Sequence, residues 1–151
     1  MRLAFMRRSR GDRGAEAVEF ALISIPLLLL IAGIVQFGFA YHAQVTVTQA
    51  ARAGARLAAI CGSTCPTSVT QSTIDAAPGL TLTAGNVNIQ YCTTGSTPTC
   101  SAGYCPAGKT QADGNAVVTV TYPYNFTFGV LTNSTSPSIT ITGKASLPCG
   151  G

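Results

Sequence analysis

The stretch that decides the fold runs from Arg13 to Arg56 and reads RGAEAVEFALISIPLLLLIAGIVQFGFAYHAQVTVTQAARAGAR. Between Glu19 and Arg52 it contains no formally charged residue. A helix of about 20 apolar residues is long enough to cross the hydrocarbon core of a bilayer, which is about 30 Å thick. The stretch therefore predicts a membrane-spanning helix. Two carboxylates, Glu16 and Glu19, stand where it begins, although a simple membrane anchor gains nothing from acid at that position.

The positive charge of the chain lies in its leader, residues 1–14. The net charge is +4, and the leader holds five arginines and one aspartate, whereas residues 15–151 hold four basic and four acidic residues. Nucleic-acid binding needs a basic patch on a folded face, so the sequence predicts no nucleic-acid partner. Positive charge on the short N-terminal side of the span predicts that the leader is cytoplasmic and that the C-terminal part faces the periplasm or the exterior.

The cysteines all follow the predicted span. An even number of cysteines on the exported side predicts disulfides formed in an oxidising compartment. The spacings Cys61-x3-Cys65 and Cys100-x4-Cys105 are also compatible with zinc bound by thiolates, but export favours disulfides. We expect a short bridge between Cys61 and Cys65, and two bridges among the other four cysteines, with their pairing left open. The six residues are Cys61, Cys65, Cys92, Cys100, Cys105 and Cys149.

The apolar segment predicts a helix that continues well beyond a membrane. Alanine, the best helix former, recurs from Tyr41 to Ile60. A helix over residues 15–60 would be about 68 Å long at 1.5 Å per residue, so part of it must extend into the periplasm. Pro26 lies inside this helix and lacks an amide hydrogen, which predicts a local kink.

A row of small residues, Ala50, Gly54 and Ala58, lies near the C-terminal end of the predicted helix. Small side chains at this spacing allow another helix to approach closely. High helix propensity alone explains the alanines equally well, and the sequence does not separate the two interpretations.

Residues 61–151 predict a small exported β domain rich in threonine and serine. They contain 18 Thr and 9 Ser but only four charged residues. Alternating patterns predict strands over residues 86–91, 116–122 and 138–142, the last extending toward Leu147, with a short helical link over 67–77. Pro123 should end the second strand or place it at an edge. The predicted fold class is therefore α+β: a long N-terminal hydrophobic helix, comprising a membrane span and a periplasmic extension, followed by a disulfide-stapled, mainly antiparallel β domain.

Two interpretations of the N-terminus compete. In the first, the leader opens an ordinary secretory signal that is cut after the small-x-small sequence Gly38-Phe39-Ala40. The uncharged run exceeds the usual apolar core of about 7–15 residues, and two glutamates stand where that core should begin, which disfavours this interpretation.

The second interpretation rests on a resemblance. The leader ending in Gly14, followed by Ala15 and by Glu19-Phe20 at the start of the apolar run, resembles the prepilin signature of type IV pilins. Together with Pro26 before four leucines and the sequence QAARAGAR over residues 49–56, it resembles the TadE/TadG-like minor pilins of the tight-adherence (Flp) system.

The resemblance implies both the processing and the assembly of the chain. A prepilin peptidase would cut between Gly14 and Ala15, so that Glu19 becomes the fifth residue of the mature protein and takes part in assembly. The implied organisation is a leader over residues 1–14, an assembly helix over 15–60 and the exported domain over 61–151. The implied location is the bacterial inner membrane, or an extracellular pilus after assembly, with other pilins and the pilus assembly platform as partners.

The chemistry-bearing residues predict no enzyme. His42 is the only histidine of the chain and lacks a partner motif, so we expect no catalytic residue, no cofactor and no metal. The predicted function is that of a structural subunit, a minor pilin or pseudopilin that supports adhesion or pilus biogenesis. The alternative is an inner-membrane-anchored periplasmic binding or scaffold module that does not enter a fibre.

Overall fold

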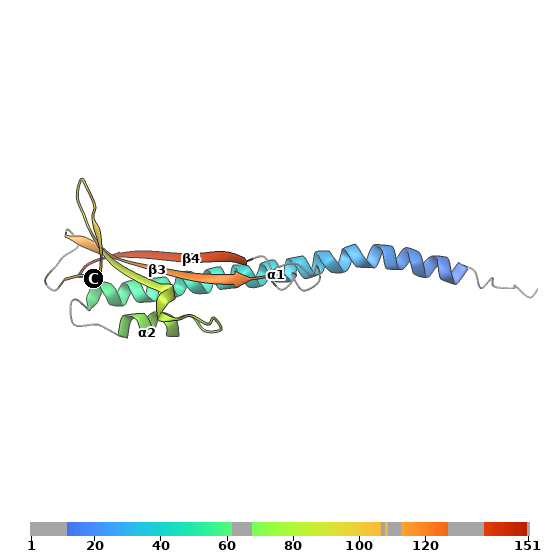
Figure 1. Cartoon of the computed structure of the whole chain (residues 1–151), viewed down its shortest axis with the longest axis horizontal. Coiled ribbons are helices and arrows are strands. Elements are labelled where there is room, and N and C mark those ends of the chain that lie inside the picture. The colour runs from blue at the N-terminus through green and yellow to red at the C-terminus, as the bar shows by residue number, and fades with distance from the viewer. Residues whose placement is uncertain (1–11, 62–67, 107, 109–112, 127–137, 151) are drawn as a thin grey trace, which may run out of the picture. The chain divides into compact units, whose positions relative to one another are not determined.

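The computed structural model describes residues 12–61, 68–106, 108, 113–126 and 138–150 (Figure 1). It divides the chain into two compact units, Met1–Gly38 and Phe39–Gly151. Helix α1, Asp12–Ile60, runs through both units and begins three residues before Ala15. The remaining elements all belong to the second unit: helix α2 (Ser68–Asp75), the short 3-10 helix η2 (Ala84–Asn86) and strands β1 (Val87–Thr93), β2 (Cys100–Ala102), β3 (Gly114–Asn125) and β4 (Ser138–Pro148).

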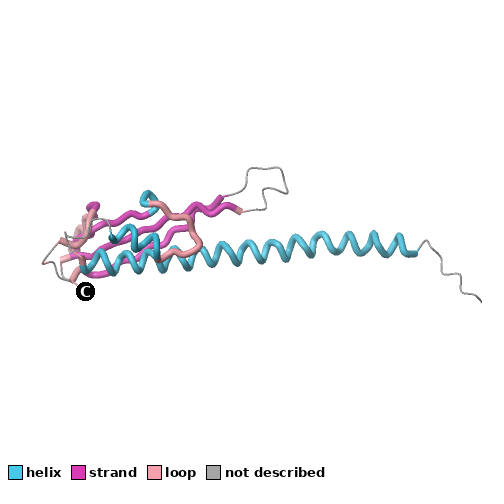
Figure 2. Tube along the Cα trace, turned by 90° about the horizontal axis from the view of Figure 1, so that it is seen from below, coloured by secondary structure: helices cyan, strands magenta, loops and turns pink. Residues whose placement is uncertain are grey.

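The strands form one antiparallel sheet with the order β2-β1-β3-β4 (Figure 2). The predicted α+β class is confirmed, because a long apolar helix is followed by a small antiparallel sheet that carries disulfides. The three strands expected from alternation are present as β1, β3 and β4, and the expected helical link corresponds to α2. Strand β2 lies outside the stretches predicted to form strands, and its three residues are all exposed, so it has no alternating apolar pattern.

Pro123 lies within β3 and does not end it. The ladder between β1 and β3 stops at the pair Val87 and Val120, whereas β3 continues to pair with β4 as far as Asn125. Among the described residues, β3 therefore has only one neighbouring strand at Pro123, so its missing amide hydrogen breaks no bond to β1. The prediction that this proline marks an edge is right for this end of β3.

The core of the second unit lies between the sheet and the alanine-rich end of α1. The sheet contributes alternate residues from β3 and β4, and α1 contributes small side chains that allow a short distance between the two layers. The fully or almost fully buried residues include Ala43, Val47, Ala50, Ala51, Ala55, Ala58, Val69, Ala116, Val118, Val120, Ile141 and Ala145. Residues between these on the strands, such as Thr119, Thr142 and Ser146, are at least partly exposed. One face of the sheet is therefore apolar and packed, and the other is largely polar, with Val117 as a buried apolar exception.

Gly54, in the small-residue row of α1, packs against α2. Ala50, Gly54 and Ala58 are all buried, and a Cβ atom added at Gly54 would collide with the side chain of Thr73 on α2. Thr73 is itself fully buried, and its hydroxyl donates to the carbonyl of Val69 at 2.7 Å, which satisfies its polar atom. The close-packing interpretation therefore applies at Gly54, and the approaching helix comes from the same chain.

The sheet approaches α1 closely at Gly143 in β4. A Cβ atom added there would lie 2.6 Å from the carbonyl oxygen of Val47 and 2.9 Å from the backbone nitrogen of Thr48. Both contacts involve helix backbone, which cannot move aside as the end of a side chain can. Only glycine fits this position without displacing the strand or the helix.

We expect Gly143→Ala to lower the free energy of unfolding of the second unit by about 1–3 kcal/mol, the usual cost of overpacking. Denaturant unfolding of the full chain in detergent, followed by circular dichroism of the strands, would measure the change. Gly85→Ala is the matched control, since an added Cβ there meets only the hydroxyl of Thr83, at 3.9 Å. An equal loss of stability in both variants would contradict the close-approach argument.

Candidate functional site

The first candidate site is the apolar surface of α1 in the first unit. Large hydrophobic side chains point outward along the whole segment and on every side of the helix. Phe20 is 74% exposed, Leu22 69% and Phe37 72%, whereas Val47 in the second unit is completely buried. Contiguous apolar surface of this extent marks a membrane-contacting or protein-contacting surface. By length and composition, Gly14–Ile60 is the one helix among the described residues that could cross a membrane.

The helix is maintained through this apolar segment in spite of Pro26. Pro26 has no amide hydrogen to donate to the carbonyl of Leu22, one turn earlier. Ser24 lies in the same turn, and its hydroxyl donates to the carbonyl of Ala21 at 3.1 Å, so its polar atom is satisfied within the helix. The kink at Pro26 stays a prediction.

The residues expected to act in processing and assembly lie together at the start of this surface. Gly14, Ala15 and Glu19 are all exposed on the first turns of α1, as is the neighbouring Glu16. A Cβ atom added at Gly14 would meet no described atom within 4 Å, so the fold of the chain does not itself require glycine there. The two glutamates lie three residues apart, about one helical turn, and therefore on the same side of the helix.

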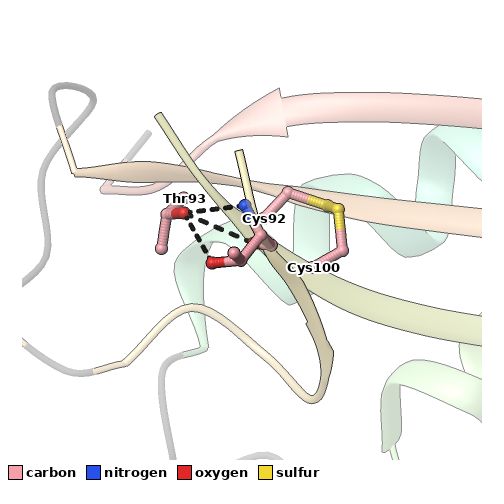
Figure 3. The surroundings of a disulfide bond; sticks show 4 residues. Cys92, Thr93 and Cys100 are labelled. Carbon is pink, nitrogen blue, oxygen red and sulfur yellow. Dashed lines mark hydrogen bonds between the residues drawn. A yellow bond between two sulfur atoms is a disulfide. The ribbon is translucent and has the colours of Figure 1, made fainter. Parts of the chain in front are cut away.

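The second unit carries the disulfides. Cys92 bonds Cys100, which closes the hairpin between β1 and β2 (Figure 3), and Cys105 bonds Cys149. Beside the first bridge, the Thr93 backbone N–H donates to the carbonyl of Thr99 at 2.9 Å. The Thr99 backbone N–H in turn donates to the Thr93 hydroxyl at 3.1 Å (Figure 3). Cys61 also forms a disulfide, and its expected partner Cys65 lies outside the described residues.

The two described disulfides close loops of very different length, which predicts different contributions to stability. Cys92 and Cys100 are 8 residues apart, and Cys105 and Cys149 are 44 apart. In the chain-entropy model these separations correspond to about 2.5 and about 4 kcal/mol. We expect the C105A/C149A variant to unfold at a clearly lower denaturant concentration than C92A/C100A, as measured under non-reducing conditions. Equal losses, or a larger loss in C92A/C100A, would contradict this order.

The structure does not assemble a metal centre in the part of the chain that it describes. No group of three or more potential ligands is found among those residues. Cys100 and Cys105, one of the pairs compatible with zinc, belong to two different disulfides. His42 is exposed on α1.

Sequence reasoning missed a basic cavity at the edge of the sheet. A cavity of about 390 Å³ is lined by Arg52 and Arg56 of α1 and by residues Lys144–Leu147 of β4. Arg52 and Arg56 are four residues apart, and this spacing indicates only that they share one side of the helix. Lys144 follows Arg56 by 88 positions, and nothing in the local sequence predicts that these three residues line one cavity.

Comparison with protein families places the N-terminal segment. Residues 14–56 match the family described as TadE-like protein. The match confirms the resemblance seen in the leader glycine, the glutamate pair and the arginine-containing end of the helix, and it identifies a segment characteristic of proteins associated with the Tad pilus system. It covers less than a third of the chain and does not extend into the β domain. No curated protein and no solved structure matches the chain.

Proposed function

We propose that this protein is a structural subunit of a tight-adherence pilus, a minor pilin or pseudopilin that assembles through α1. The observation that carries the proposal is the TadE-like match over residues 14–56, which includes the uncharged, outward-facing apolar part of α1. A helix of this kind is stable in two surroundings, lipid and a bundle of similar helices. A subunit that moves from the membrane into a fibre needs a surface compatible with both.

The orientation of the subunit follows from charge and cysteine chemistry. The five arginines of the leader favour retention of the N-terminus in the cytoplasm. The disulfides Cys92–Cys100 and Cys105–Cys149 favour a periplasmic or extracellular location for the β domain. Both arguments support an inner-membrane precursor whose C-terminal domain is exported, and whose assembled form is extracellular.

Processing would convert this precursor into the assembling form. A prepilin peptidase would cut between Gly14 and Ala15, which removes the basic leader and keeps the apolar helix. The mature protein would then contain residues 15–60 as its assembly helix and residues 61–151 as its exported domain. Its partners would be the peptidase, other pilins and the proteins of the assembly platform. Its role would be structural, with no catalysis and no cofactor, and would support adhesion or pilus biogenesis.

N-terminal sequencing of the mature protein, combined with shearing of cells, tests this function. We expect the sequence of the mature protein to begin at Ala15. We also expect the protein to appear in the sheared pilus fraction of wild-type cells, but to stay in the membrane of cells that lack the assembly platform. The alternative function is an inner-membrane scaffold module that presents the β domain to a periplasmic partner. A mature protein that stays in the membrane fraction of pilus-producing cells would favour that alternative.

A further inference from the structure

The basic cavity lies along an open edge of the sheet. Strand β4 is the outermost strand on its side, and its 11 residues pair only with β3 among the described residues. An edge strand of this length offers a row of unpaired backbone groups, to which another extended segment can add.

Two hydrogen bonds show which residues of β4 face outward. In an antiparallel strand, successive residues direct their backbone N–H and C=O groups to opposite sides. Cys149, directly after β4, donates its N–H to the carbonyl of Gly114 in β3 at 3.0 Å, so every second residue before it faces β3. Thr142 lies an odd number of positions before Cys149, so its backbone groups face away from β3. Its carbonyl accordingly accepts a hydrogen bond from Gln44 Nε2 of α1 at 3.2 Å. Lys144 and Ser146 follow Thr142 at every second position, so their backbone groups also face away from β3 and lie on the open edge.

Positive charge is concentrated at the same edge. Four cations follow the leader in the sequence, and three of them, Arg52, Arg56 and Lys144, line the cavity. All three are exposed, and none forms an ion pair within the part of the chain that the structure describes. Arg52 and Arg56 come from the helix packed on the apolar face of the sheet, whereas the Lys144 side chain lies on the polar face, since its neighbours Gly143 and Ala145 are buried.

From this geometry we infer that the edge of β4 is a docking site for an extended acidic segment of another protein. The backbone of the segment pairs with Lys144 and Ser146, and its carboxylates pair with Arg52 and Arg56 on one face and with Lys144 on the other. Arginine binds carboxylates through two parallel hydrogen bonds, which fixes the register of the added strand. A second copy of this chain is a poor occupant, because pairing two β4 edges brings like charges together. The inference does not depend on whether the chain enters a fibre.

Peptide binding to the full-length protein in detergent micelles tests this inference. The probe is a fluorescein-labelled peptide of sequence TVTEETVT, and its binding is measured by fluorescence anisotropy. The two adjacent glutamates point to opposite faces when the peptide is extended. We expect R52Q/R56Q to weaken binding about five- to thirtyfold, the range for the loss of two partly solvated arginine contacts to the one glutamate on that face. Binding should also weaken with added salt.

Three comparisons decide the outcome. T81E/N88E changes the net charge by the same amount as R52Q/R56Q at two exposed positions outside the cavity, and should bind normally. The peptide TVTKKTVT should not bind, and a TVTEETVT peptide methylated on alternate backbone nitrogens should bind far more weakly. Amide exchange at Lys144 and Ser146 should slow when the acidic peptide is bound. Equal binding of the lysine or methylated peptide, unchanged binding to R52Q/R56Q, or an equal loss in T81E/N88E would overturn the inference.

Discussion

The Glu19→Ala variant is expected to be exported and cleaved normally but to be depleted at least about tenfold from sheared pili. Cleavage before Ala15 creates a new α-amino group, which is ordinarily protonated at neutral pH. In a packed bundle of apolar helices, the carboxylate of Glu19 is available to pair with the α-amino group of a neighbouring subunit. Removal of one partner of a charge pair that is shielded from water costs several kcal/mol, because the other charge stays unpaired.

The effect should be confined to the assembled state. In the unassembled protein Glu19 is exposed, and at a membrane boundary water and headgroups can solvate it. Glu16→Ala is the matched control, because it removes the same charge three residues earlier and should be incorporated normally. Quantitative immunoblots of whole-cell, membrane and sheared fractions measure the distribution. Normal incorporation of Glu19→Ala would refute the assembly role, and uncleaved Glu19→Ala would indicate a role in processing.

The Gly14→Leu variant is expected to accumulate almost entirely as the uncut precursor. A Cβ atom at this position meets no described atom within 4 Å, so the substitution leaves the folded chain undisturbed. Any block in processing must then arise in the peptidase, where a bulky side chain next to the cleaved bond prevents close approach of the backbone. Intact-mass measurement of the purified protein distinguishes the precursor from a product that begins at Ala15.

Gly33→Leu provides the control for this experiment. Gly33 lies in the same helix and also has no described neighbour within 4 Å of an added Cβ, so this variant should be cleaved normally. A wild-type protein that retains Met1 would refute cleavage after Gly14. A wild-type protein that begins at Tyr41 would support the secretory interpretation instead.

Much of the architecture follows from local sequence. The alanine-rich, uncharged stretch predicted a helix ending near Ile60, because helix propensity and apolar composition act over a few turns. Alternation predicted β1, β3 and β4, because the two faces of each strand meet different surroundings. The leader glycine and the glutamate pair showed the resemblance to TadE-like proteins, because that resemblance depends on residues that are close together in the chain.

Only the tertiary structure decided how distant segments meet. The partners of Cys92 and Cys105 depend on where the chain returns after loops of 8 and 44 residues, and spacing alone does not choose between them. The need for glycine at position 143 arises from the backbone of Val47. The basic cavity arises because the packing of β4 against α1 places Lys144 and the two arginines, Arg52 and Arg56, around one cavity at the edge of the sheet. Helices and alternating strands are set by interactions between near neighbours, whereas disulfide partners, close backbone contacts and surface charge clusters are set by the register between elements, which no short stretch of sequence contains.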